Sequence, residues 1–335
     1  KKLDRRKMKD ILEYLFEYNK LDYDQAKKIL IEINSNKYSN SEISSFMTVF
    51  KMRNPSIEEM EGFRDALLEL CVKINFEQFN TVDLCGTGGD GKDTFNISTI
   101  SSFVVAGAGF KVTKHGNYGV SSNCGSSNVL EYLGVKFTND ESHLKKCLDK
   151  FNICYLHAPL FHPSMKNVAP IRRELGFKTF FNLLGPLVNP TKPQNQITGV
   201  YNLEIARLYG YIFKNTDKNF SIIYSLDGYD EISLTNEFKL ITNNEEIISN
   251  ASYFKLNKVD PNKILGGKSI EESADIFVNI LRGKGSESQV NVVLANSSLA
   301  IRTLTGKDIE ECYSIAKESL DSGKAYNSLK KLIQL

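Results

Sequence analysis

The first ~75 residues show the apolar pattern of amphipathic helices. One run of apolar side chains at helical spacing consists of Met8, Ile11, Leu12, Leu15 and Phe16. The stretch Leu21 to Ile33 repeats the pattern, and Ser56 followed by Glu59 is a capping-box signal before a further helical run. This part of the chain is therefore predicted to be helical, and nothing in it indicates catalysis.

From Thr81 onward, short β-prone runs alternate with helical runs. Strands are predicted at 81–85, 110–113, 153–156 and 221–224, and helices at 97–108 and 129–133. This alternation predicts an α/β fold with a central, mostly parallel sheet flanked by helices. Ligands of such sheets bind at the carboxyl ends of the strands, and glycine-rich loops follow the first two predicted strands.

Composition excludes several classes of protein. The 335 residues are 41% hydrophobic and 24% charged with a formal net charge of +2, which gives no global indication of nucleic acid or membrane binding. No apolar run approaches the roughly 20 residues that cross a bilayer. The six cysteines are scattered without a C-x-x-C pair, which favours reduced thiols in a cytoplasm over disulfides or zinc.

The first loop, D-L-C-G-T-G-G-D-G at positions 83–91, is rich in glycine. Its backbone N–H groups can approach an anion closely, because no side chains block them. Asn96, Ser98 and Thr99 follow at the predicted start of a helix, where unpaired N–H groups suit a phosphate. A tight turn with a capped helix would explain the same residues, and the Gly-Lys-Ser/Thr ending of a P-loop is missing.

The second loop, K-H-G-N-Y-G-V-S-S at positions 114–122, supplies a cation, an amide and two hydroxyls just after a strand. One such loop alone is more often simply polar. Two of them at successive strand ends favour a shared polyphosphate pocket.

Two further segments carry candidate chemistry. Arg172, which lies between His162-Pro163 and the stiff N-L-L-G-P-L-V-N-P run at 182–190, could grip a carboxylate, although a surface arginine explains it equally. Asp230 and Glu231 follow a predicted strand and could hold Mg²⁺, although adjacent acids are common on surface loops. No H-E-x-x-H or G-x-S-x-G motif is present, which disfavours a zinc centre and a serine hydrolase.

In these motifs the sequence resembles the anthranilate phosphoribosyltransferase family. The resemblance rests on G-T-G-G-D at 86–90, K-H-G-N at 114–117, the stretch 162–190, G-Y-D-E-I at 228–232, and shorter matches at 265–267 and 320–325. It covers nearly the whole chain. It implies transfer of the phosphoribosyl group of phosphoribosyl pyrophosphate (PRPP) to the amine of anthranilate, in tryptophan biosynthesis, with Mg²⁺.

The resemblance also implies a domain organisation. Residues 1–75, with an inserted segment near 160–190, would form a small helical domain that makes a homodimer. Residues 80–160 and 190–335 would form the large α/β domain that binds PRPP. The apolar N-terminal residues Met8, Leu12, Leu15 and Phe16 favour the dimer, because a few short helices do not bury so many.

Site residues follow from the resemblance one by one. Those implied for PRPP are Gly86, Thr87, Gly89, Asp90, Thr94, Asn96, Ser98, Thr99, Lys114 and Ser122. Those implied for anthranilate are Gly86, Asn117, His162, Arg172, Gly185 and Pro186, the last two shaping its access channel. Of two Mg²⁺ ions, Ser98 with Glu231 would hold one, and Asp230 with Glu231 the other. His115 or His162 could take the proton late in the reaction, but neither is assigned.

The chain departs from the family at a few positions. Tyr118 and Gly119 stand where Arg and Ala or Ser are usual, Asn128 stands where Asp is usual, and His157 stands where Phe is often found. A cationic contact in the second loop is therefore expected to be missing. The sequence begins at Lys1, and the family is fused to a glutamine amidotransferase domain in some bacteria, so a fusion to or complex with such an anthranilate synthase component is a hypothesis.

Two other functions remain as alternatives. A pyrimidine-nucleoside phosphorylase is similar in fold, but lacks the Asp-Glu pair and this spelling of the glycine loop. A non-catalytic nucleic-acid-binding relative would be strongly basic with an eroded glycine loop, unlike this chain.

Overall fold

The computed structural model describes residues 7–119 and 124–334. The chain divides into two compact units. The first, called the helical unit, comprises Lys1–Lys73 and Pro159–Pro190, and the second, called the sheet unit, comprises Ile74–Ala158 and Thr191–Leu335.

The helical unit includes four N-terminal helices, and side-chain caps mark the starts of the last three. The four are α1 (Met8–Phe16), α2 (Tyr23–Asn34), α3 (Asn40–Met52) and α4 (Ile57–Leu70). The predicted capping box of α4 is present: the Glu59 N–H donates to Ser56 Oγ at 3.2 Å, and the Ser56 N–H donates to Glu59 Oε2 at 2.7 Å. Capping of this kind satisfies N–H groups that the helix itself leaves unpaired.

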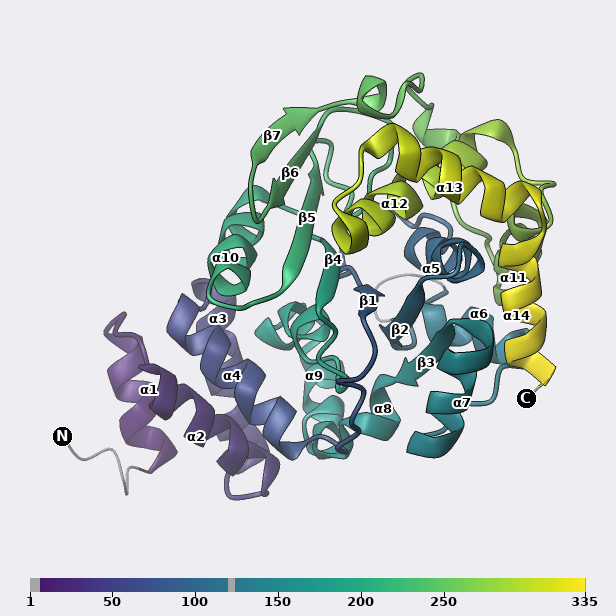
Figure 1. The fold of residues 1–335 in the computed structure, drawn as a ribbon. Helices are drawn as coiled ribbons and strands as arrows, with labels where there is room; N and C mark the ends of the chain where they lie inside the picture. The colour runs from purple at the N-terminus through teal and green to yellow at the C-terminus, as the bar shows by residue number, and fades with distance from the viewer. Residues whose placement is uncertain (1–6, 120–123, 335) are drawn as a thin grey trace. The chain divides into compact units, whose positions relative to one another are not determined.

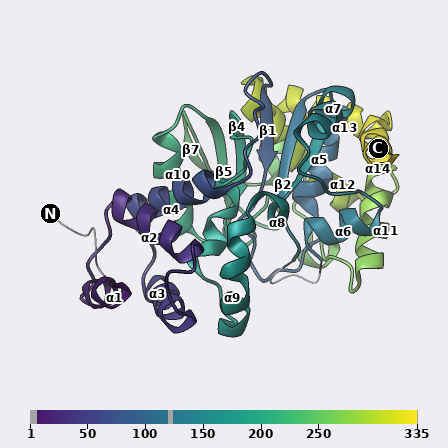
Figure 2. The same cartoon turned by 90° about the horizontal axis from the view of Figure 1, so that it is seen from below.

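The second segment of the helical unit is built of short helical turns. They are α8 (Ala158–Phe161), η1 (Pro163–Asn167), α9 (Ala169–Leu175), η2 (Phe180–Leu183) and η3 (Gly185–Leu187). Figure 2 shows α9 beside α3, and these two helices are in contact. Asn167 Nδ2 also donates to the carbonyl oxygen of Asn34, at the end of α2, at 2.8 Å.

An aromatic cluster joins the two segments of this unit. Phe180 lies with its ring centroid 4.5 Å from Phe63 of α4, 5.1 Å from Phe50 of α3 and 4.4 Å from Phe181. Phe46 completes the cluster at 6.0 Å from Phe180. Residues more than a hundred positions apart in sequence therefore share one core.

The sheet unit is built on seven strands in the order β3-β2-β1-β4-β5-β6-β7 (Figure 1). The strands are β1 (Thr81–Leu84), β2 (Lys111–Gly116), β3 (Ile153–His157), β4 (Asn195–Gly199), β5 (Asn219–Ser225), β6 (Phe238–Thr242) and β7 (Glu246–Ser249). The first five strands pair in parallel, and β6 and β7 are added antiparallel. The predicted mostly parallel sheet is confirmed, although β4, β6 and β7 were not predicted.

Helices cover both faces of this sheet. They are α5 (Ile97–Gly107), α6 (Ser126–Tyr132), α7 (Glu141–Phe151), α10 (Leu203–Lys214), α11 (Ile270–Leu281), α12 (Glu287–Thr305), α13 (Ile309–Asp321) and α14 (Lys324–Gln334), with short turns η4 (Ala251–Phe254) and η5 (Pro261–Lys263). Ser221 of β5 bonds Thr303 of α12, whereas its neighbour Phe220 stacks on Phe213 of α10. Successive strand residues point to opposite faces, so α12 and α10 lie on opposite sides of β5, as Figure 1 shows.

The order of the strands reverses between β1 and β4. From β1 the chain moves outward through β2 to β3, and from β4 it moves in the other direction through β5. In open α/β sheets such a switch point is where ligands bind, outside the carboxyl ends of the strands. Within the described residues, no helix is long and apolar enough to span a membrane.

Candidate functional site

The glycine-rich loop leaves β1 at the switch point and runs alongside β4. The Cys85 N–H donates to the carbonyl oxygen of Ile197 at 3.1 Å, and the Thr87 N–H to that of Gly199 at 2.9 Å. Gly88 has a φ of 67°, in the left-handed region that favours glycine, and a Cβ on it would meet no atom within 4 Å. The loop backbone at Gly88 therefore faces open space, as an anion site needs.

The predicted acidic pair meets this loop. Asp230 Oδ2 accepts the Gly88 N–H at 2.8 Å, and a Cβ on Gly86 would lie only 2.7 Å from the same oxygen. Glu231 Oε1 accepts the N–H of Ser98, in the first turn of α5, at 3.2 Å. The structure thus brings together Gly86, Ser98, Asp230 and Glu231, which lie far apart in sequence.

A buried asparagine that the sequence reasoning missed fixes the backbone beside the pair. Asn296 Oδ1 accepts the Ile232 N–H at 3.1 Å, and Asn296 Nδ2 donates to the Ile232 carbonyl oxygen at 2.9 Å. Ser225 Oγ donates to the carbonyl oxygen of Glu231 at 2.7 Å. The signal available in the sequence was a single amide inside the apolar run V-V-L-A-N at 292–296 of α12.

The acidic pair carries more negative charge than its surroundings neutralise. Burial, and then repulsion from Asp90, raises the pKa of Asp230. Burial, and then repulsion from Asp230, raises the pKa of Glu231, although Lys114 opposes the shift. Asp90 adds a buried carboxylate oxygen that has no hydrogen-bond partner in the structure. A divalent cation fits this excess of charge.

The residues present suit Mg²⁺ better than a metal held by protein alone. Among the described residues, no group of three or more His, Cys, Asp or Glu side chains is arranged to hold a metal ion. Mg²⁺ is usually bound through one or two carboxylates, with water and substrate phosphates as its other ligands. Asp230 and Glu231 can supply those carboxylates.

The other residues predicted to bind PRPP have individual surroundings. Lys114 is 3% exposed, and its amino group donates to the carbonyl oxygens of Leu84 and His115. Thr87 Oγ1 donates to Gly199 O at 3.4 Å, Asn96 Nδ2 donates to Cys124 O at 3.0 Å, and Thr99 is buried.

Gly89, Thr94 and Ser122 are also among the residues predicted to bind PRPP. Gly89 has a positive φ of 79° in the same loop. Thr94 forms an isolated bridge with Leu265. Ser122 lies outside the described residues.

Two candidates at the end of β2 take no part in the acidic cluster. Asn117 is exposed, and its side-chain oxygen accepts the N–H of Tyr118 at 2.8 Å. His115 is 2% exposed, and its backbone N–H donates to Asp83 Oδ1 at 3.1 Å.

One candidate for anthranilate in the helical unit, Arg172, is a partly buried cation. Arg172 of α9 donates to Asn182 Oδ1 at 3.2 Å, and its guanidinium lies over the Phe181 ring at 5.4 Å. Burial lowers the pKa of Arg172. No acidic side chain of the described residues forms an ion pair with it, whereas its neighbour Arg173 is exposed. A carboxylate ligand would suit such a cation.

The remaining candidates of this unit are His162, Gly185 and Pro186. His162 is 4% exposed, and its Nε2 lies 3.0 Å from the carbonyl oxygen of Val188. Pro186 is buried, whereas a Cβ on Gly185 would meet no atom within 4 Å.

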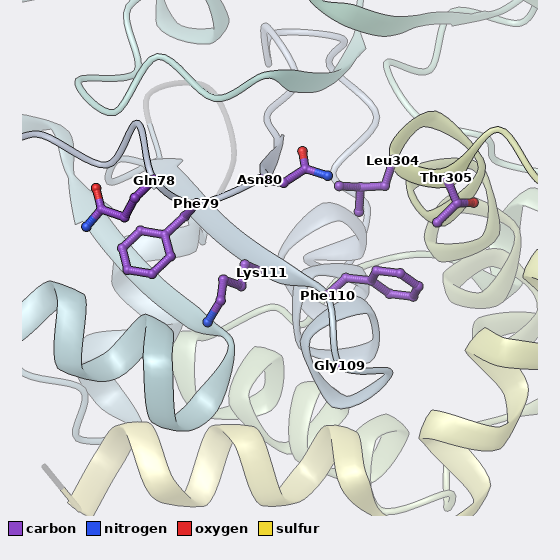
Figure 3. Close-up of a pocket in the computed structure, with 8 residues that line it drawn as sticks. All are labelled: Gln78, Phe79, Asn80, Gly109, Phe110, Lys111, Leu304 and Thr305. Atoms are coloured by element: carbon purple, nitrogen blue, oxygen red, sulfur yellow. The ribbon is translucent and has the colours of Figure 1, made fainter.

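A pocket of about 280 Å³ in the sheet unit lies away from this chemistry (Figure 3). Its lining comes from residues just before β1 and β2 and from the end of α12: Gln78, Phe79, Asn80, Gly109, Phe110, Lys111, Leu304 and Thr305. It is therefore at the amino ends of those strands, opposite the glycine loop. The Lys111 amino group already donates to the carbonyl oxygen of Leu148 at 2.9 Å, and no acid lines the pocket, so we do not assign it to catalysis.

Comparison with known proteins covers both units. Residues 9–71 match the helical bundle domain of a glycosyl transferase family, and residues 78–326 match its a/b domain. The predicted fold class, a helical domain plus an α/β domain, is confirmed. Anthranilate phosphoribosyltransferases from Christiangramia forsetii and Flavobacterium johnsoniae are each 58% identical to this chain, over 98% of it and 99% of their own lengths.

Solved structures agree with these matches. The crystal structure of anthranilate phosphoribosyltransferase from Thermus thermophilus is 26% identical, with a TM-score of 0.90 over 97% of this chain and 98% of that one. The enzyme from Saccharomyces cerevisiae in complex with PRPP and Mg is 27% identical, with a TM-score of 0.90 over 98% of this chain and 97% of that one. The yeast enzyme has also been solved with 4-fluoroanthranilate, at 25% identity and a TM-score of 0.86 over 98% of this chain and 96% of that one.

Proposed function

This chain belongs to the anthranilate phosphoribosyltransferase family, and we propose that it transfers the phosphoribosyl group of PRPP to the amine of anthranilate, releasing pyrophosphate, in tryptophan biosynthesis. The observation that carries the proposal is the contact of the G-T-G-G-D loop with the Asp230–Glu231 pair. It occurs in a chain that matches anthranilate phosphoribosyltransferases over 98% of its length.

PRPP binds in the sheet unit in this proposal. Its phosphates lie beside the glycine loop and the start of α5, and Lys114 supplies positive charge. Mg²⁺ at Asp230 and Glu231, with Ser98 as a further ligand, neutralises the charge that grows on the leaving pyrophosphate. Two ions per subunit are proposed from the resemblance to the family, with Ser98 and Glu231 at one ion and Asp230 and Glu231 at the other.

In this proposal Arg172 and His162, both of the helical unit, bind anthranilate. The guanidinium of Arg172 holds the carboxylate and so orients the amine. An aryl amine already has a lone pair, so no strong base is needed before it attacks the ribose carbon. Positioning of the two substrates then supplies much of the rate acceleration.

The test is the loss of anthranilate fluorescence after addition of PRPP and Mg²⁺. The double variant Asp230→Ala/Glu231→Ala should lose nearly all turnover while keeping its circular dichroism spectrum. The control is Glu310→Ala/Glu311→Ala, an exposed adjacent pair on α13 whose loss should leave turnover unchanged. Full turnover in EDTA, or in the Asp230/Glu231 double variant, would refute the metal site.

A pyrimidine-nucleoside phosphorylase is the alternative function, and an assay of nucleoside phosphorolysis tests it. It would release a free base from a nucleoside with inorganic phosphate and without metal. Phosphorolysis in EDTA together with stable anthranilate fluorescence would overturn the proposed function.

The oligomeric state and partners are further proposals. Met8, Leu12 and Leu15 are buried within the chain itself, so these three side chains are not available for a dimer interface. Exposed Phe16 and Met52, at 56% and 74% of their surface, remain as support for a homodimer. A monomeric mass in light scattering at micromolar concentration would refute it.

A complex with a glutamine amidotransferase component stays a prediction, which co-purification with that component tests. A cytoplasmic location is proposed from the six cysteines, all of which are free thiols.

A further inference from the structure

The described residues just after β2 are held by contacts that involve all the positions where this chain departs from the family pattern. Tyr118 and Gly119 follow β2, Asn128 lies on α6, and His157 ends β3. These elements are neighbours, and side chains from each of them converge on the residues just after β2.

The Tyr118 side chain makes two contacts. Its hydroxyl donates to the carboxylate of Glu131 on α6, at 3.1 Å and 3.3 Å to the two oxygens. Its ring meets the His157 ring edge to face, with centroids 4.9 Å apart. Partial burial, and then the hydrogen bond to Glu131, raises the pKa of Tyr118, so its hydroxyl stays protonated and able to donate near neutral pH.

Asn128 holds the backbone on either side of positions 120–123. Its side-chain oxygen accepts the N–H of Gly119 at 2.9 Å and the N–H of Gly125 at 3.0 Å. A Cβ on Gly125 would overlap the backbone nitrogen of Gly119, so the two glycines approach more closely than other residues allow. One amide oxygen therefore ties both glycines to the start of α6.

The His157 side chain is held in place by Ser127 and Phe137. It is 5% exposed, its Nδ1 lies 2.8 Å from Ser127 Oγ, and its ring stacks on Phe137 at 4.5 Å. The surface against which the Tyr118 ring packs is thus rigid, which limits the positions that Tyr118 can take.

We propose that Tyr118 and Glu131, with Asn128, form a clasp that holds the backbone at Gly119 and Gly125 in place for the binding of PRPP, without touching PRPP itself. Tyr118 replaces the cation usual at this position and acts as a neutral hydrogen-bond donor to Glu131. The inference rests on the proposed function, because it assumes that the second loop binds PRPP. Tyr118, Glu131 and Asn128 are positioning residues in this scheme.

A double-mutant cycle tests the clasp. The measured quantity is the Kd of PRPP with Mg²⁺, by calorimetry, beside kcat and the KM of each substrate. Tyr118→Phe keeps the ring against His157 and removes only the hydroxyl, whereas Glu131→Ala removes its acceptor. Each should raise the Kd of PRPP about three- to tenfold, as expected for one hydrogen bond. The double variant should cost no more than either single one, because both remove the same bond.

Rescue variants separate positioning from general damage. Glu131→Gln keeps an acceptor for the Tyr118 hydroxyl and should bind PRPP nearly as well as the wild-type protein. Asn128→Asp keeps an oxygen for both N–H groups and should also be near normal, whereas Asn128→Ala should be impaired. A Tyr118→Phe protein with wild-type Kd, or fully additive effects of Tyr118→Phe and Glu131→Ala, overturns the clasp.

The wild-type protein separates this inference from the proposed function. If it neither binds PRPP nor consumes anthranilate, the proposed function fails. If it does both while the clasp variants are unaffected, only the clasp fails.

Discussion

Replacement of Gly199 by Ala should damage the metal site from the opposite side of the switch point. Gly199 ends β4, and a Cβ there would overlap the carbonyl oxygen of Asp230 and lie 2.5 Å from its carbonyl carbon. Reaching the 3.4 Å of ordinary van der Waals contact requires a shift of more than about 0.9 Å, which is what the carbonyl carbon alone would need, because the carbonyl oxygen lies closer still. The Asp230 backbone must move, since β4 is held between β1 and β5.

That shift is enough to break the contact between the acidic pair and the glycine loop. The Gly88 N–H to Asp230 bond is 2.8 Å long, so a lengthening of about 0.9 Å or more takes it beyond hydrogen-bond range. Overpacking costs about 1–3 kcal/mol, and loss of a charged hydrogen bond about 1.5–3 kcal/mol. We expect Gly199→Ala to lower the free energy of unfolding by roughly 1–3 kcal/mol and kcat/KM for PRPP by at least about tenfold.

Gly210→Ala is the matched control. Gly210 is buried in α10, and its added Cβ would lie 3.6 Å from Ile241 Cγ2, an ordinary contact. Alanine is the better helix former by about 0.5–1 kcal/mol, so this variant should be as stable as the wild type or more so, with full activity. Chemical denaturation and Mg²⁺-dependent turnover measure both effects. The reasoning is wrong if Gly199→Ala keeps the wild-type unfolding free energy and Mg²⁺ dependence.

Three further predictions concern other parts of the chain. Arg172→Ala should raise the KM of anthranilate roughly 10- to 150-fold, because it loses a charge-assisted bond worth about 1.5–3 kcal/mol. The KM of PRPP should stay unchanged, and the control Arg173→Ala, at an exposed residue, should keep the wild-type KM of anthranilate. A rise in the KM of PRPP alone would assign Arg172 to the phosphate site. Phe180→Ala should lower the free energy of unfolding by about 3–5 kcal/mol, whereas Met52→Ala, at an exposed residue, should lower it by less than about 0.5 kcal/mol. Equal losses in the two variants would show that the aromatic cluster does not stabilise the fold. Burial and Asp90 raise the pKa of Asp230, so the metal-free fold favours its protonated form, and that stability is lost as pH rises through the raised pKa. Without Mg²⁺, Asp230→Asn should therefore have a higher melting temperature than the wild type, and the difference should grow as pH rises from about 4. A difference in melting temperature that shrinks as pH rises would contradict this reasoning.

The hydrophobic pattern predicted four of the seven strands and missed β4, β6 and β7. The predicted runs at 81–85, 153–156 and 221–224 correspond to β1, β3 and β5. Strand β4 was missed because its sequence, N-Q-I-T-G, contains one large apolar residue although all five residues are buried. Asn195 is tolerated there because its side chain donates to Asn80 at 2.7 Å and to the carbonyl oxygen of Thr81 at 2.9 Å. Such compensation depends on the neighbouring strand, which a local pattern does not contain.

The candidate site divides in the same way. The glycine loop and the Asp230–Glu231 pair could be proposed because each lies at the end of a predicted strand, where chemistry is expected. Asn296 was missed, since its role depends on contact with Ile232 across the fold. The partners of Tyr118 were also missed, because the bond to Glu131 spans 13 residues between a loop and a helix.

Because the helical unit is built from two separate segments of the chain, its core cannot be completed early in translation. The Phe180 ring, which completes the aromatic core of α3 and α4, is made more than a hundred residues after the last of those helices. At about 5–20 residues per second, the nascent N-terminal helices wait roughly 5–20 s for it. During that interval Phe46, Phe50 and Phe63 lack the ring that packs against them, and they are a surface that a chaperone can hold. Slow codons between α4 and η2 should therefore lower the yield of folded protein more than slow codons placed after η3.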